Sequence, residues 1–467
     1  MADASDEFGE FVTPARTLWI RAALVVLCLI AAAVVFWPRE FSAASLFGPT
    51  SWTPSHDSQL QSVDLLVVHA QLLPAWGIAS ANREVPGGKE AEAKAAAALR
   101  AAIAADKNLT EIFDELRSLS AEPAENAERL IQLTKFWSAY LDGEGAPYLV
   151  QSNVVSTSSS TFFYLKSYEV RRDLALSIGS ENVRAREVLR LDKTNIVEQY
   201  LGATAPGQED ATVVLDRLSE FAVSRVWPML ANDHLTPLGT KVVEELRANL
   251  APEALRILTK HAPKRRLMQL ALDGVESRRD CGSTFVIRAV GFAGLASKDL
   301  DTLDRLAKQA QGHPCPDITV EEAEILREAS EDFVDDDQLP GAVRALVELL
   351  GTNVAIHEAR HVVDDRLVDG LQQPMTCNDC PDSMSVVAIA ELSAYLASIA
   401  WSPVPYTTFF QACDATEGQG GPHARAMALI MDRLETFCGE APPKLAERAA
   451  GLELRILGRS DRVVLHK

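Results

Sequence analysis

Apolar side chains recur along most of the chain at the three- and four-residue spacing of an amphipathic helix, which predicts a mostly α-helical protein. Helices are expected at residues 91–105, 111–119, 124–141, 170–178, 184–201, 211–226, 238–250, 263–275, 299–311 and 320–333. One segment differs, because residues 148–155 and 161–168 are rich in β-branched and aromatic side chains and a serine-rich loop separates them. This pattern predicts a β-hairpin at 148–168.

An uncharged apolar run from Ala22 to Trp37 predicts a single membrane-spanning helix near the N-terminus. Extended back to Thr17, the run approaches the roughly 20 residues that cross a hydrocarbon layer about 30 Å thick. Two arginines, Arg16 and Arg21, lie on its N-terminal side and Arg39 follows it, which favours a cytoplasmic N-terminus and an exported body. A cleaved signal peptide is the second interpretation.

These signals divide the chain into five expected parts. They are a short cytoplasmic tail at 1–15, a membrane anchor at 16–38, a stalk at 39–61, a helical domain with the hairpin at 62–335, and a C-terminal domain at 336–467. The last boundary lies at an acidic patch that is followed by Pro340 and Gly341. The expected location is therefore a cell membrane, with the body in the periplasm or outside the cell.

Cysteine use agrees with export. The body contains Cys281, Cys315, Cys377, Cys380, Cys413 and Cys438, an even number that suits three disulfides in an oxidising compartment. Fifteen connectivities are possible, and pairing between neighbours in the sequence is favoured. Cys377 and Cys380 also have the spacing of a metal knuckle, but no second pair of ligands is near them.

The net charge of the chain bears on which kinds of partner it can bind. The chain has 45 basic and 65 acidic residues, a formal net charge of −20, so it offers no basic stripe to a phosphate backbone. Nucleic-acid binding is therefore not expected, and the sequence does not determine the oligomeric state.

The candidate catalytic and metal-binding residues lie mainly on a helix that is expected to begin near Gly341. His357 and His361 are four residues apart and so lie on one face of this helix, with Glu358 beside them. Two imidazoles supply two of the three protein ligands of a catalytic zinc ion, and the adjacent carboxylate can take a proton from a metal-bound water.

A third ligand is expected on the following helix. Between Ser383 and Cys413, Glu391 is the only charged side chain. An ionised carboxylate in a buried helix is costly unless a cation or hydrogen-bond donors compensate it. Glu391 is therefore the candidate to complete the site with His357 and His361.

The His-Glu-x-x-His motif followed by a glutamate on the next helix resembles the gluzincin group of zinc metallopeptidases, over residues 343–401. The resemblance implies a Zn²⁺ held by His357, His361 and Glu391, with Glu358 as the general base. Thermolysin-like members have an acidic residue four positions after the ligand glutamate, where this chain has Tyr395. An acidic residue one turn after His361, Asp364 or its neighbour, is the alternative acceptor for a ligand imidazole.

The resemblance implies a membrane-anchored peptidase that acts on a peptide or protein substrate. A hydrogen-bond donor is then needed for the developing oxyanion, and the candidates are Tyr395 and His423. The hairpin at 148–168 is a candidate for the edge strand that binds an extended peptide. The alternative function is a helical cell-envelope scaffold or binding protein whose His-Glu-x-x-His motif is inactive and whose partners bind helices between residues 60 and 335.

Overall fold

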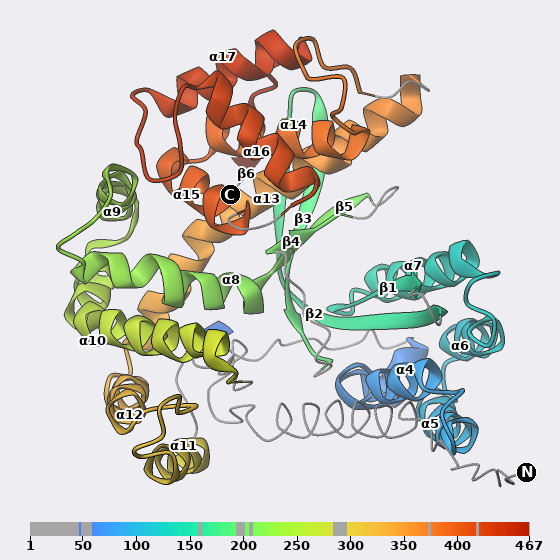
Figure 1. Ribbon diagram of the computed structural model, residues 1–467. Coiled ribbons are helices and arrows are strands. Elements are labelled where there is room, and N and C mark those ends of the chain that lie inside the picture. The colour runs from blue at the N-terminus through green and yellow to red at the C-terminus, as the bar shows by residue number, and fades with distance from the viewer. Residues whose placement is uncertain are drawn as a thin grey trace, which may run out of the picture.

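In the computed structural model, helices surround a curled mixed β-sheet (Figure 1). The structure describes residues 46–47, 58–156, 161–192, 201–204, 209–283, 297–371, 375–416 and 420–466. The predicted membrane helix and tail and most of the predicted stalk lie outside these residues. Helix predominates as predicted, but the sheet is larger than the single hairpin that was expected.

Within the described part of the chain, the sheet has six strands. They are β1 (Tyr148–Ser156), β2 (Thr161–Ile178), β3 (Glu181–Arg190), β4 (Gly202–Ala203), β5 (Asp210–Val214) and β6 (Val463–His466). The order is β1-β2-β3-β5-β4, and β6 pairs with the last part of β2. The β3–β5 pair is parallel and the other pairs are antiparallel. The predicted hairpin is confirmed as β1 and the first half of β2.

The helix predicted at residues 170–178 is wrong, because this segment is the second half of β2. A β-bulge lies between Val170 and Arg172 and shifts the alternation of buried positions. Phe163 and Leu165 are buried before the bulge, whereas Leu174 and Ile178 are buried after it. The four-residue spacing of Val170, Leu174 and Ile178 imitates a helix, and this similarity explains the error.

The helices predicted at 184–201 and 211–226 are also wrong where they overlap strands. Residues 181–190 form β3, and residues 210–214 form β5 before a helix begins at Leu215. Two charged side chains, Arg186 and Glu187, are buried in β3. Because charge at buried positions hides the apolar alternation of a strand, periodicity alone did not reveal β3.

The N-terminal helices form a layer on β1 and the first half of β2. They are η1 (Gln59–Ser62), α3 (Leu65–Val67), η2 (Val68–Leu72), α4 (Leu73–Ala81), α5 (Gly88–Ala102), α6 (Lys107–Leu119) and α7 (Ala127–Gly143). Trp76, Phe113 and Trp137 are fully buried in the core that they share with Phe163 of β2. The predicted helices at 91–105, 111–119 and 124–141 are confirmed as α5, α6 and α7.

The central helices follow β5. They are α8 (Leu215–Phe221), η3 (Ala222–Val226), η4 (Trp227–Ala231), α9 (Pro237–Asn249), α10 (Pro252–Ser277), η5 (Arg278–Cys281), α11 (Ser297–Gln309) and α12 (Val320–Asp335). The first of them packs against the sheet, whereas the last two pack against α10 in a core separate from that of the sheet. The predicted helices at 238–250, 299–311 and 320–333 are confirmed as α9, α11 and α12. The helix predicted at 263–275 begins earlier, at Pro252, and contains Pro263.

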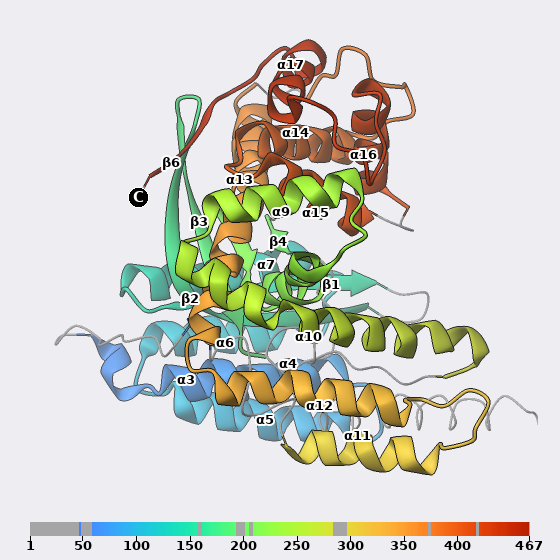
Figure 2. The same cartoon turned by 90° about the vertical axis from the view of Figure 1, so that its left-hand side faces the viewer.

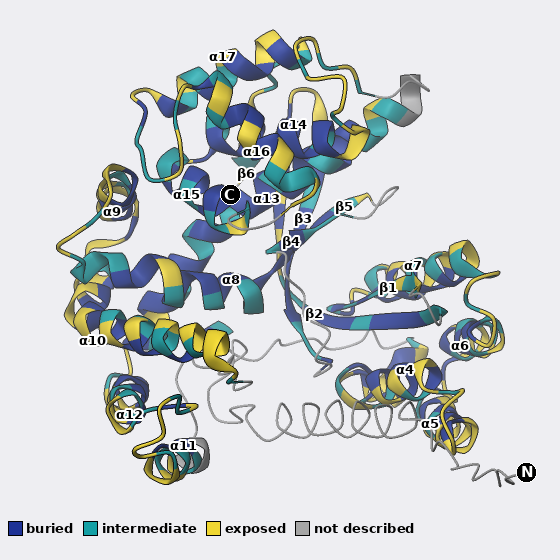
Figure 3. Cartoon of the chain, viewed as in Figure 1, coloured by how far each residue is buried: buried dark blue, intermediate teal, exposed yellow. Residues whose placement is uncertain are grey.

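The longest helix among the described residues, α13 (Leu339–Leu371), crosses the molecule from the α10 and α12 side to the C-terminal helices (Figures 1 and 2). Among the described residues, Leu339–Val368 alone is long and apolar enough to cross a membrane, but 61% of its most apolar window is buried inside the protein. It is therefore a core helix, and Figure 3 shows buried residues along α13 and the sheet.

The C-terminal helices cover the far end of α13. They are α14 (Val386–Trp401), α15 (Pro405–Thr416), α16 (Pro422–Arg433) and α17 (Leu445–Leu457). Disulfides join Cys281 to Cys315, Cys377 to Cys380 and Cys413 to Cys438, which confirms the favoured pairing of sequence neighbours. Three disulfides indicate that the body resides in an oxidising, extracytoplasmic compartment.

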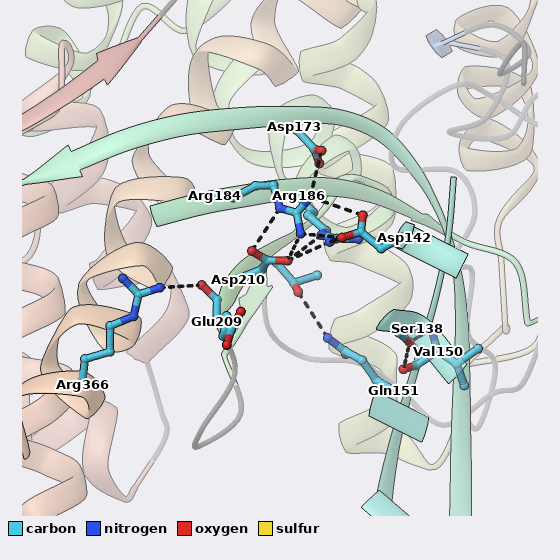
Figure 4. A network of polar contacts seen from close by, with 11 residues as sticks. Ser138, Asp142, Val150, Gln151, Asp173, Arg184, Arg186, Glu209, Asp210 and Arg366 are labelled. Carbon is cyan, nitrogen blue, oxygen red and sulfur yellow. Dashed lines mark hydrogen bonds and ion pairs between the residues drawn. The ribbon is translucent and has the colours of Figure 1, made fainter. Parts of the chain in front are cut away.

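A polar network connects the N-terminal layer, the sheet and α13 (Figure 4). Asp142 of α7 and Asp210 of β5 both pair with Arg184 and Arg186 of β3. At the residue before Asp210, the backbone carbonyl of Glu209 accepts a hydrogen bond from Arg366 of α13. Because β5 is held from both sides, the edge strand β4 that pairs with it has a defined position beside α13.

Candidate metal centre

Two imidazoles on α13 point to one place because they lie one helical turn apart. The Nε2 atoms of His357 and His361 are 3.3 Å apart. On the opposite side of the same turns, Ala355, Ala359 and Val362 are buried in the core that α13 shares with the sheet. The packing of α13 on the sheet therefore turns both imidazoles toward α14.

Glu391 of α14 is the third member of the group. Its Oε2 atom lies 3.4 Å from Nε2 of His357 and 3.5 Å from Nε2 of His361. The three ligand atoms thus form a nearly equilateral triangle. A tetrahedral zinc ion bound at about 2.0–2.1 Å needs ligand atoms about 3.3–3.4 Å apart, so the donor set and its spacing fit zinc.

Burial makes the Glu391 carboxylate dependent on a cation. Only 8% of the residue is exposed, and among the described residues its Oε2 atom receives no hydrogen bond of regular geometry. A buried carboxylate oxygen of this kind needs a positive partner. His357, His361 and Glu391 accordingly form a candidate metal site.

The electrostatics of the site favour a charged Glu391 carboxylate beside a charged His361 imidazole. Burial alone would raise the pKa of Glu391, but the imidazoles of His357, His361 and His423 hold it well below its usual range. Burial alone would lower the pKa of His361, but the Glu391 carboxylate in particular raises it to about 9. The site therefore attracts positive charge, which suits a metal cation.

Tyr395 and His423 lie next to the same carboxylate. Tyr395 is one turn after Glu391 on α14, and His423 lies in the first turn of α16. Nδ1 of His423 is 2.9 Å from Oε2 of Glu391 and 3.1 Å from the Tyr395 hydroxyl. The two side chains predicted to assist the reaction are therefore adjacent to the candidate metal ligands.

Glu358 contacts the edge strand of the sheet rather than the ligand helix α14. The hydroxyl oxygen of Thr204 is 2.9 Å from Oε2 of Glu358 and 3.1 Å from the backbone carbonyl oxygen of the same residue. Thr204 directly follows β4, so the strand and α13 hold the carboxylate between them. This contact restricts the rotamer of Glu358.

Gly202 allows this close approach of strand and helix. A Cβ atom at position 202 would lie 2.5 Å from Cγ of Glu358 and 2.7 Å from Cγ1 of Val354. No side chain fits such distances without displacing one of the two elements. The strand at the site is thus β4, and not the hairpin that the sequence suggested as a peptide-binding edge.

Behind the two histidines, a buried ion cluster joins α13 to the C-terminal segments. Arg360 is fully buried and lies 3.0 Å from Asp364, 3.0 Å from Glu453 of α17 and 3.1 Å from Asp461. Its Nε also donates to the hydroxyl of Ser393 on α14. Burial raises the pKa of Glu453 to about 7, although Arg360 opposes this shift. Arg360 thus connects both ligand-bearing helices.

This cluster also contains Asp364. The sequence offered it as an acceptor for a ligand imidazole, but it pairs with Arg360 and Arg459. Its carboxylate is therefore engaged on the side of α13 that carries the ion cluster.

The candidate metal ligands open into a cavity of about 330 Å³. Its lining includes the predicted residues and several that the sequence analysis did not select. They are Leu201, Gly202, Ala203, Thr204, Asn353, Val354, His357, Glu358, His361, Glu391, Tyr395, Ser398, Thr408, Gln411, Ala412, Ala415 and His423. A cavity of this size lies at the small end of the range for ligand sites.

Comparison with known proteins does not extend this assignment. No protein-family model, curated protein or solved structure significantly matches the chain. The chemistry of the site therefore has to be inferred from its own residues.

The structure brings together all six residues predicted for the site. His357, His361 and Glu391 form the triangle, Glu358 lines the same cavity, and Tyr395 and His423 adjoin Glu391. Three further lining residues, Gly202, Thr204 and Gln411, were not predicted from the sequence. A two-residue strand and a neutral amide carry no spacing signal, so only the tertiary structure reveals their place.

Replacement of Gly202 by alanine is expected to destabilise the protein by about 1–3 kcal/mol, because the new methyl group overlaps Glu358 and Val354. Denaturation by urea measures this change. Gly143→Ala is the matched control, since a Cβ there meets open space and should leave the free energy of unfolding unchanged or slightly higher. Equal stability of the Gly202 variant and the wild type would contradict the close contact between β4 and α13.

Replacement of Arg360 by methionine is expected to lower stability by about 3–5 kcal/mol, because Asp364 and Glu453 lose their buried partner. It should also lower zinc affinity about 10- to 100-fold, since the two ligand helices lose a shared contact. Competition with a chelator measures the affinity, and Arg360→Lys should restore part of it.

The control is Arg265, a second buried arginine that lies between the rings of Trp227 and Phe333. Arg265→Met should destabilise the protein and leave zinc affinity unchanged. An equal loss of affinity in both variants would mean that Arg360 acts only through global stability.

Proposed function

We propose that the protein is a zinc-dependent metallopeptidase of the gluzincin type, anchored in a cell membrane by the predicted helix at 16–38. The observation that carries the proposal is the triangle of His357, His361 and Glu391, with Glu358 in the same cavity. A zinc ion bound there would polarise a peptide carbonyl and lower the pKa of its water ligand. The disulfides support an exported body, with the N-terminus in the cytoplasm.

Glu358 is the proposed general base. Its carboxylate lines the cavity one residue after His357, and Thr204 holds one of its oxygens. The other oxygen, Oε1, can take a proton from the attacking water and deliver it to the leaving amine. A carboxylate held in one position loses little entropy in this step, which favours proton transfer.

Tyr395 and His423 are the proposed donors to the oxyanion. The Tyr395 hydroxyl lies within hydrogen-bond distance of Nδ1 of His423, and the same nitrogen lies next to the Glu391 carboxylate. A phenol hydroxyl and an imidazole N–H directed at the developing negative charge would stabilise it. The lining strand β4 lies at the edge of the sheet, which supports an extended peptide as the substrate.

Metal content tests the ligand set. Elemental mass spectrometry of the purified full-length protein should find about one zinc per chain, and His361→Ala and Glu391→Ala should each lose or weaken it. His261→Ala is the control, because this buried histidine pairs with Asp332 and Asp336 and not with the site. A wild type that binds no metal after zinc reconstitution would favour the non-catalytic scaffold.

Replacement of Glu358 by glutamine should reduce hydrolysis of unfolded casein about 100- to 10,000-fold and leave zinc bound, because the amide cannot accept the proton. Glu348→Gln, on the same helix and 40% exposed, should keep the wild-type rate. Loss of zinc from the Glu358 variant would show that this residue is a ligand and not the base.

A further inference from the structure

A series of hydrogen bonds, in which each residue donates to the next, leads from Val404 to Gln411 in the cavity lining. The backbone N–H of Val404 donates to the hydroxyl of Ser402 at 2.9 Å, and this hydroxyl donates to Oδ1 of Asn353 at 2.5 Å. The side-chain amide of Asn353 then donates to Oε1 of Gln411 at 3.3 Å. In this series of hydrogen bonds, the oxygens of Ser402, Asn353 and Gln411 each accept one hydrogen bond. The amide nitrogen Nε2 of Gln411 is therefore left as a donor at the end of the series.

This last donor is buried, and the residue that carries it, Gln411, lines the cavity. Gln411 is 6% exposed, and among the described residues its Nε2 atom has no hydrogen-bond partner. A buried amide N–H₂ without an acceptor is costly, and native proteins rarely retain one without a role. An acceptor that enters the cavity can therefore pair with it.

The neighbouring groups restrict what that acceptor belongs to. Val354, Ala412 and Ala415 provide apolar surface, whereas Ser398 and Thr408 provide hydroxyls. Both hydroxyl hydrogens are committed, because Ser398 donates to the carbonyl of Tyr395 and Thr408 to that of Val404. Their oxygens are thus left as acceptors, so Gln411, Ser398 and Thr408 together offer one donor and two acceptors in the cavity lining.

The group also lies next to the candidate metal ligands. Asn353 precedes His357 by four residues, so it lies one helical turn away on the same face of α13. One turn corresponds to about 5–6 Å, roughly the distance from a scissile bond to the adjoining side chain of a peptide. The polar end of the cavity is therefore placed to hold a substrate side chain.

We propose that Gln411, Ser398 and Thr408 form a subsite for a side-chain carboxamide, so that the peptidase prefers asparagine or glutamine beside the cleaved bond. The carboxamide oxygen accepts from Gln411, and its N–H₂ donates to a hydroxyl oxygen. An aliphatic side chain would leave Nε2 unpaired, and among the described lining residues there is no lysine or arginine to bind a carboxylate. This specificity rests on the proposed function.

Binding of N-acetyl amino-acid hydroxamates tests the subsite without requiring catalysis. Calorimetry on the zinc-loaded full-length protein would compare the glutamine, leucine, glutamate and lysine probes with acetohydroxamate, which has no such side chain. The glutamine probe should bind about 10- to 100-fold more tightly than the leucine probe. Gln411→Met should bring this ratio close to one while acetohydroxamate binds as in the wild type.

Two further variants test whether Gln411 determines the side-chain preference. Gln411→Glu replaces the donor by an acceptor and should shift the preference to the lysine probe. Thr416→Val, on the same helix but outside the cavity lining, should keep the preference for glutamine. Equal binding of all side chains to a wild type that holds zinc would overturn the subsite and leave the peptidase proposal intact. Absence of both zinc and acetohydroxamate binding would overturn the two together.

Discussion

The structure depends on one constraint: α13 is a core helix that also carries charged groups. Its sheet-facing side is apolar, and Ala355, Ala359 and Val362 are fully buried there. The same turns carry Glu358 and Arg360, both buried, so each needs a partner within the protein. The elements around α13 are arranged to supply those partners, and the candidate site is the result.

Three elements meet this need on different sides of the helix. The edge strand β4 brings Thr204 to Glu358, helix α14 brings Glu391 to the two imidazoles, and α17 brings Glu453 to Arg360. Each contact compensates one charge, and together they fix α13 relative to the sheet and the C-terminal helices. The arrangement that satisfies the buried charges is therefore the same one that positions the candidate ligands.

The sequence predicted the site better than the fold around it, for a physical reason. The spacing of His357 and His361 is a local helical property, and Glu391 stood out because no other charge lies on its helix. The second half of β2 and the strand β3 were predicted as helices because a bulge shifts the alternation in β2 and buried charges such as Glu187 interrupt it in β3. Gly202 and Gln411 act through contacts between distant segments, which local periodicity does not encode.

The disulfides tie the candidate site to the compartment of the body. Cys377 and Cys380 close the turn that leads into α14, and Cys413 at the end of α15 is joined to Cys438 beyond α16. Glu391 and His423 lie on two of these helices, whose shared core is separate from that of the sheet. Cross-links restrict how far such a small core can loosen, so oxidation and the geometry around Glu391 support each other. In a reducing compartment, the same helices would hold the third candidate ligand against α13 by packing alone.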